Sequence, residues 1–229
     1  MRGFHPPQMI VDRVIARRGA AHIHANFDGS RTALLAIDLQ NAFLTEAHSP
    51  SPIPGALTIL PCVNRLAEAL RHAGGGVFWI KHAITAETQR TWSSWFALNA
   101  FDEERARRRI ATLSPGHPGY ELHPDLNLAP SDEIVAKQRF SAFIGNSSDL
   151  HERLTKRGFD TVLIAGVLTN VCVESTARDA MMMNYKTIVV SDATAAPTEA
   201  EHNAALTSLY STFGDVLDTD SVLERSSRR

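Results

Sequence analysis

Three side chains of complementary chemistry each follow an apolar segment of the sequence. Asp38 comes directly after the run 33–37, Lys137 directly after 133–136, and Cys172 about one turn after 161–166. A thiol, a carboxylate and an ammonium can act as a nucleophile, its base and a charge-stabilising cation. Their similar positions after apolar runs make them candidates for one active site.

The chemistry of a cysteine nucleophile explains why the other two groups matter. A free thiol has a pKa of roughly 8.5 and is mostly protonated at neutral pH. We expect Cys172 to lie at a helix entrance, where the helix dipole favours the thiolate. Asp38 can accept the thiol proton, and Lys137 can hold the charges in place. The backbone N–H groups of Leu168 and Cys172 could bind the oxyanion that forms on an attacked carbonyl.

Each of the three residues also has a purely structural interpretation. Cys172 could be a small buried apolar residue, Asp38 an N-cap of the next segment, and Lys137 a surface charge. The site would be absent only if all three structural interpretations were correct. The combination therefore favours an active site over three unrelated residues.

The pattern of apolar and amphipathic segments predicts the elements that would position these side chains. Short apolar runs alternate with longer amphipathic stretches, which is typical of βαβ units around a parallel sheet. We expect strands at 33–37, 76–81, 133–136, 161–166, 186–190 and 215–217. We expect helices at 56–73, 149–158, 171–184 and 198–212. In an open parallel sheet, ligands bind beyond the carboxyl ends of the strands, where the three candidate residues would lie.

The 229 residues suit a single α/β domain, here 31–229, preceded by an N-terminal arm at 1–30 that could pack on a neighbour. The stretch 82–132 is irregular; its aromatic residues could be core or could wall a pocket. Its charged portion, 102–109, is interpreted as a solvated helix face. Cys62 falls within a predicted helix and is interpreted as structural.

Composition points to a small-molecule ligand. Lys and Arg number 23 and Asp and Glu 25, for a net charge of −2, which favours neither nucleic acid nor an anionic membrane as a partner. There is no apolar run of roughly 20 residues and no secretion signal, so a cytoplasmic location is expected. His22 and His24 could offer two metal ligands, but an edge strand or exposed arm is favoured. We expect no metal and no cofactor.

Three motifs resemble those of the isochorismatase-like cysteine hydrolases, in the same order. They are Ala-Ile-Asp-Leu-Gln-Asn-Ala-Phe at 36–43, Lys-Gln-Arg-Phe-Ser-Ala-Phe at 137–143, and Gly-Val-Leu-Thr-Asn-Val-Cys-Val-Glu-Ser-Thr-Ala-Arg-Asp at 166–179. The resemblance extends from about Arg31 to Asp220. It implies an Asp38–Lys137–Cys172 triad, a doubly wound six-stranded parallel sheet in a three-layer α/β/α fold, and a cis peptide bond between Val167 and Leu168. It also implies a homodimer or homotetramer.

The residues of these motifs are similar to those of the branch of this family that acts on ureido and N-carbamoyl compounds. The segment 79–85 lacks the set of metal-binding residues found in nicotinamidase-like members. The resemblance thus implies a cysteine-dependent amidohydrolase that cleaves a carbon–nitrogen bond of a small amide, ureido or N-carbamoyl compound through a thioester. The alternatives are a vinyl ether hydrolase with Asp38 as general acid, or a binding protein without catalysis. Candidate substrate contacts are Phe43, implied by the resemblance, and Asn41, His82, Trp92, Trp95 and Phe140.

Overall fold

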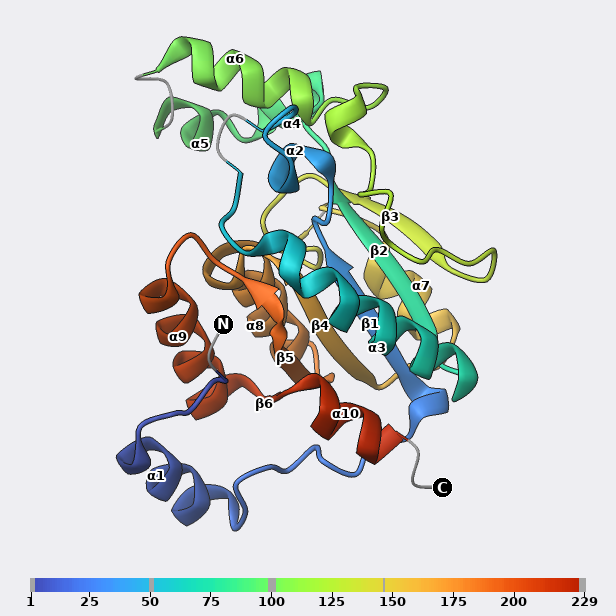
Figure 1. Ribbon diagram of the computed structural model, residues 1–229, viewed down its shortest axis with the longest axis vertical. Coiled ribbons are helices and arrows are strands. Elements are labelled where there is room, and N and C mark those ends of the chain that lie inside the picture. Colours follow the sequence, from blue (N-terminus) through green and yellow to red (C-terminus); the bar gives the residue numbers. More distant parts are fainter. Residues whose placement is uncertain (1–2, 50–51, 99–101, 146, 227–229) are drawn as a thin grey trace.

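The computed structural model describes residues 3–49, 52–98, 102–145 and 147–226. Within them, six strands form one parallel sheet in the order β3-β2-β1-β4-β5-β6 (Figure 1). The strands are β1 Thr32–Ile37, β2 Gly76–His82, β3 Glu133–Lys137, β4 Thr161–Val167, β5 Lys186–Ala195 and β6 Asp215–Leu217. The predicted doubly wound α/β fold is confirmed, with β5 longer than predicted.

The α-helices are α1 Gln8–Arg18, α2 Asn41–Leu44, α3 Leu60–His72, α4 Ala86–Thr91, α5 Ser93–Leu98, α6 Glu103–Thr112, α7 Leu150–Lys156, α8 Glu174–Met182, α9 Glu199–Ser208 and α10 Thr219–Ser226. Short 3₁₀ segments occur at η1 Gly29–Arg31, η2 Ala56–Ile59 and η3 Pro118–Tyr120. Two π-helical turns, η4 Thr169–Val173 and η5 Leu209–Phe213, extend the helical stretches predicted at 171–184 and 198–212.

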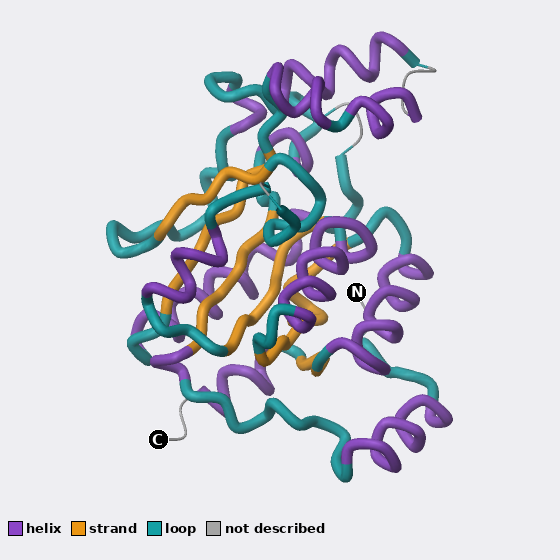
Figure 2. The backbone as a smooth tube through the Cα atoms, turned by 180° about the vertical axis from the view of Figure 1, so that it is seen from behind, coloured by secondary structure: helices purple, strands orange, loops and turns teal. Residues whose placement is uncertain are grey.

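Helices cover both faces of the sheet, as seen from the front and from behind (Figures 1 and 2). Successive side chains of a strand point to opposite faces. Accordingly Leu34 packs in a core with α3 and α10, whereas Leu35 packs in a second core with α7 and α8. Every residue of β1, β2 and β4 is buried. This double burial explains why these strands read as continuous apolar runs.

The order of the strands reverses between β1 and β4, which is where a doubly wound sheet opens a crevice at its carboxyl edge. The segments that follow β1 and β4 carry Asp38 and Cys172. Lys137 ends β3, two strands from β1. The topology therefore directs all three candidate residues to the same edge of the sheet.

Above this edge, α4, α5 and α6 form a layer that we call the cap, at the top of Figure 1. A small apolar cluster joins the cap to α2: buried Ile84 and Leu113 pack with Phe43, Trp95 and Phe96. Part of the irregular stretch 82–132 thus forms short helices, whereas 121–132 has no helix. The charged run 102–109 lies largely in α6, where most of its side chains are exposed.

The N-terminal arm contains a helix, α1, that was not predicted from the sequence. In α1 only Val14 is buried, so the apolar spacing of the segment is too weak to indicate a helix. Arg18 fastens α1 to the rest of the fold by donating hydrogen bonds to the carbonyls of Tyr210 and Gly214 and pairing with Asp215. The arm therefore packs on its own domain.

His22 and His24 lie in the loop after α1, neither in a strand nor on a fully exposed arm. The backbone N–H of His24 donates to the Asp215 carboxylate at 2.7 Å. Among the described residues there is no group of three or more His, Cys, Asp or Glu side chains that could hold a metal ion. Nor does any described helix have the length and apolar character needed to cross a membrane.

Candidate active site

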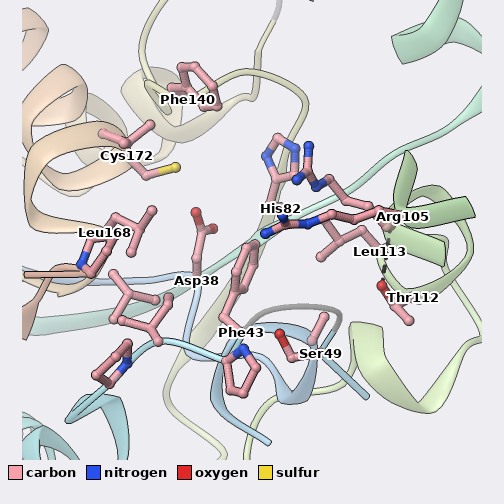
Figure 3. Close-up of a pocket in the computed structure, with 18 of the residues that line it drawn as sticks. Asp38, Phe43, Ser49, His82, Arg105, Thr112, Leu113, Phe140, Leu168 and Cys172 are labelled. Atoms are coloured by element: carbon pink, nitrogen blue, oxygen red, sulfur yellow. Dashed lines mark hydrogen bonds between the residues drawn. The ribbon is translucent and has the colours of Figure 1, made fainter. Parts of the chain in front are cut away.

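Asp38 lies at the point where β1 ends, and its side chain is 1% exposed. Its backbone N–H donates to the Ile80 carbonyl of β2, which ties the end of β1 to the neighbouring strand. Its φ of 56° lies in the left-handed region, which Asp tolerates better than most residues. The chain thus turns sharply at the sheet edge and leaves the carboxylate facing the cavity (Figure 3).

Lys137, at the end of β3, is completely buried and makes an ion pair with Asp38. Its Nζ lies 2.8 Å from Asp38 Oδ2, 3.1 Å from the Arg139 carbonyl oxygen and 3.3 Å from His82 Nδ1. Burial lowers the pKa of Lys137, but Asp38 and Cys172 raise it by more, so the ammonium form is favoured. The structure therefore holds a positive charge beside the carboxylate, in the interior of the protein.

His82 ends β2 and completes the surroundings of the ammonium. Burial, with the nearby Lys137 charge, lowers the pKa of His82 well below its usual value, so the ring is neutral. An ammonium can only donate, and Nδ1 must therefore be the acceptor of the Lys137 contact. His82 thus helps to orient Lys137 and also lines the cavity.

Cys172 lies in the wide turn η4 that leads from β4 into α8, and it is 7% exposed. Burial raises the pKa of its thiol, and the Lys137 charge offsets this only in part. The expected thiolate at a helix entrance is therefore not the resting form, because desolvation outweighs the favourable charges. Asp38 raises the pKa of the thiol further, so both charged groups act on the sulfur, in opposite directions.

The carboxylate is also shifted from its ordinary behaviour. Burial raises the pKa of Asp38 even though Lys137 opposes this shift. A raised pKa makes Asp38 a better proton acceptor than an exposed carboxylate. A protonated thiol beside such a carboxylate is a pair between which a proton can move.

The turn that carries Cys172 approaches β1 closely because of Gly166. Gly166 has a φ of 110°, and a Cβ added there would lie 2.0 Å from the Ile37 carbonyl oxygen. Only glycine fits this position, directly beside the residue that precedes Asp38. The peptide bond between Val167 and Leu168 is cis, as expected from the motif resemblance.

Asp38 and Cys172 line a cavity of about 370 Å³. Lys137 is completely buried and does not line the cavity, but it contacts Asp38 and His82, which do. Several other candidates line this cavity: Phe43, His82, Phe140 and Leu168, which Figure 3 shows, and Trp95. A volume of this size suits a small molecule. The remaining lining residues include Ser49, Pro52, Ile53, Pro54, Thr112, Leu113, Val167, Val171 and Pro197.

Two predicted substrate contacts, Asn41 and Trp92, lie outside the lining of the cavity. The Asn41 side chain donates to the Pro118 carbonyl at 3.0 Å and holds α2 against η3. Trp92 stacks on Trp95 with ring centroids 4.7 Å apart and meets Phe140 edge-on at 4.8 Å. Both residues therefore support the residues that line the cavity.

Arg105 and Arg109 line the cavity, although neither was predicted from the sequence to do so. They belong to the charged run interpreted as a solvated helix face. Residues four apart share one side of a helix, so Arg105 and Arg109 point the same way from α6. That spacing was visible in the sequence, but the direction of this face depends on how the cap packs.

Together, the reversal of strand order at β1 and β4 and the buried Asp38, Lys137 and Cys172 define a doubly wound α/β protein with a thiol site at its switch point. The family model described as the isochorismatase domain matches residues 32–221. The chain therefore belongs to the isochorismatase family of hydrolases.

Several relatives are similar over most of the chain. Ureidoacrylate amidohydrolase RutB of Methylobacterium radiotolerans is 32% identical over 202 residues, which cover 83% of this chain and 78% of that protein. A cysteine hydrolase from Pseudomonas syringae pv. phaseolicola matches with a TM-score of 0.74 and 27% identity, over 88% of this chain and 94% of that one. N-carbamoylsarcosine amidase from Thermoplasma acidophilum matches with a TM-score of 0.64 and 25% identity, over 83% and 97%.

Proposed function

We propose that the protein is a cysteine-dependent amidohydrolase that cleaves a carbon–nitrogen bond of a small amide, ureido or N-carbamoyl compound. One observation carries the proposal: a buried thiol lies beside a carboxylate that is 2.8 Å from a buried ammonium, at the wall of a small-molecule cavity. The names of two relatives support the substrate class, since one is a ureidoacrylate amidohydrolase and the other an N-carbamoylsarcosine amidase.

In the first half of the reaction, Asp38 accepts the thiol proton while Cys172 Sγ forms a bond to the substrate carbonyl carbon. The carbonyl electron pair moves to oxygen, and the N–H groups of Leu168 and Cys172 donate to that oxyanion. The geometry of η4 supports this role, because the Leu168 carbonyl accepts from the amides of Val171 and Val173 on either side of Cys172. When the carbon–nitrogen bond breaks, Asp38 returns the proton to the leaving nitrogen.

In the second half, water attacks the thioester with Asp38 again as the base. The carbon–sulfur bond breaks, and the proton that Asp38 has taken from water returns to the sulfur. For an N-carbamoyl substrate the released carbamic acid decomposes to carbon dioxide and ammonia. Lys137 stays charged throughout and keeps the Asp38 carboxylate in place, because leaving either group alone in the interior is unfavourable.

The test compares two cysteine variants for ammonia release from a panel of ureido acids, carbamoyl amines and simple amides. Cys172→Ala should lower turnover on the order of 10⁴-fold or more while the circular dichroism spectrum is retained. Cys62→Ala is the control: Cys62 lies in α3 with its Sγ 3.7 Å from Asp192 Oδ2, and its loss should leave turnover unchanged. Intact-protein mass spectrometry of the wild type should show an acyl adduct that Cys172→Ala lacks.

Two outcomes would contradict the proposal. An active Cys172→Ala enzyme would favour the vinyl ether hydrolase, in which Asp38 acts alone as a general acid. Absence of both ammonia and an adduct across the panel would favour a binding protein without catalysis.

A further inference from the structure

The wall of the cavity that the cap provides is positively charged. Arg105 and Arg109 both line the cavity from α6. Figure 3 shows Arg105 reaching in from the side opposite Cys172, with Asp38 and His82 between them. Among the described lining residues the only carboxylate is that of Asp38, which is paired with Lys137. The two guanidinium groups therefore give this wall a net positive charge.

The two arginines are close enough to affect each other and the inner part of the site. Burial lowers the pKa of Arg109, and the like charge of Arg105 lowers it further. The Arg109 charge also contributes to lowering the pKa of His82, which contacts Lys137. Arg109 is half-buried with its Cζ 5.7 Å from the centre of the Trp95 ring, whereas Arg105 is exposed at the rim. An anion bound at this wall would reduce the repulsion between the two like charges.

We propose that Arg105 and Arg109 bind a carboxylate of the substrate while its ureido or amide carbonyl lies against Cys172. This deepens the proposed function and rests on it for the position of the carbonyl. The planar guanidinium offers paired N–H donors that match the two oxygens of a carboxylate. Apolar side chains such as Phe43, Ile53 and Val171 line the same cavity as the two arginines and Cys172. The substrate class is therefore an N-carbamoyl or amide derivative of a small carboxylic acid with an apolar spacer.

Binding is measured by calorimetry in a Cys172→Ala background, so that turnover does not interfere. The probes are N-carbamoylglycine, N-carbamoyl-β-alanine and N-carbamoyl-γ-aminobutyrate, each paired with an N-alkylurea in which an isopropyl group replaces the carboxylate. We expect at least one of the acids to bind at least about tenfold more tightly than its neutral partner, since hydrogen bonds to charged groups are the strong ones. Arg105→Gln/Arg109→Gln should abolish this preference.

The matched control is Arg107→Gln/Arg108→Gln, which removes the same charge from exposed positions of the same helix. It should leave the preference for the acids intact. Arg109 contacts Trp95, so its substitution can also change the packing of the cap. The single variant Arg105→Gln keeps the contact between Arg109 and Trp95. Arg105→Gln should weaken binding of the acids and leave the thermal midpoint unchanged.

The outcomes separate this inference from the proposed function. If no acid binds better than its alkylurea, or if the control variant loses as much preference as the test variant, the carboxylate subsite is wrong. Efficient ammonia release from the alkylureas would then leave the amidohydrolase proposal standing. Conversely, Arg-dependent binding of the acids without ammonia release by the wild type would retain the subsite and overturn the amidohydrolase.

Discussion

The carboxyl edge of the sheet and the cap build opposite walls of one cavity by different means. The sheet edge contributes side chains that are almost completely buried, with Asp38 1%, Lys137 0% and Cys172 7% exposed. The cap contributes half-buried Trp95 and Arg109 and exposed Arg105, and α5 has no buried residue. A substitution at the sheet edge must therefore disturb the core, whereas a substitution in the cap need not. This difference separates the chemistry of the site from its selectivity.

The largest effect that would test this comparison concerns the buried ion pair. Lys137→Met replaces the ammonium by an apolar group of similar length and leaves the Asp38 carboxylate unpaired in the interior. We expect a loss of about 3–5 kcal/mol in the free energy of unfolding, together with loss of turnover. Asp38→Asn/Lys137→Met should recover part of the stability but not the activity. Chemical denaturation and ammonia release measure the two properties.

Lys186→Met is the matched control for that prediction. Lys186 pairs with Asp160 at 3.5 Å, but both side chains are solvent-accessible, and such pairs contribute about 0–1 kcal/mol. If Lys137→Met were no more destabilising than Lys186→Met, buried side chains at the carboxyl edge of the sheet would contribute no more to stability than solvent-accessible ones. The comparison would then be wrong.

The second prediction concerns the close approach of β4 to β1. Gly166→Ala would place a methyl group against the Ile37 carbonyl oxygen, in a backbone conformation that alanine rarely adopts. We expect destabilisation of about 3 kcal/mol or more, because both strain and collision contribute. Turnover should fall as well, since the collision lies beside Asp38 and in the strand that leads to Cys172.

Gly158→Ala separates strain from collision. Gly158 also has a positive φ, of 71°, but an added Cβ would meet nothing within 4 Å. Its substitution should cost about 1 kcal/mol and leave turnover unchanged. Equal losses of stability in the two variants would show that backbone strain alone is decisive and that the strand contact is not.

The same comparison explains what could be predicted from the sequence. The six strands could be predicted because buried parallel strands are apolar runs. The cluster of Asp38, Lys137 and Cys172 could be predicted because a polar residue that follows such a run lies at the edge of the sheet. The inward direction of Arg105 and Arg109 could not be predicted, because α6 has charged residues on most sides and its orientation depends on tertiary packing. The raised pKa of the Cys172 thiol also required the structure, since local sequence indicates the helix entrance but not the depth of burial.

The smallest expected effect concerns His82, where the two regions meet. The His82 ring contacts Lys137 at the sheet edge and lies 6.4 Å from Trp92 of the cap, between ring centroids. Its pKa is lowered in the folded protein by burial and by Lys137, so the unfolded state binds a proton more readily. The resulting stability is present above pH roughly 6.5 and is lost as the pH falls below that value.

His82→Asn removes the titrating group and keeps an oxygen that can accept from Lys137. Below pH roughly 6.5 the free energy of unfolding of the wild type should decrease more steeply than that of the variant, by up to about 1.4 kcal/mol per pH unit. His22, His24 and His202 also have lowered pKa values and contribute the same slope to both proteins, so only the difference between the two reports on His82. Denaturation with urea across this pH range measures that difference. Identical slopes would mean that His82 takes up a proton in the folded state, which would place a second positive charge beside Lys137 and contradict its role as the acceptor for that ammonium.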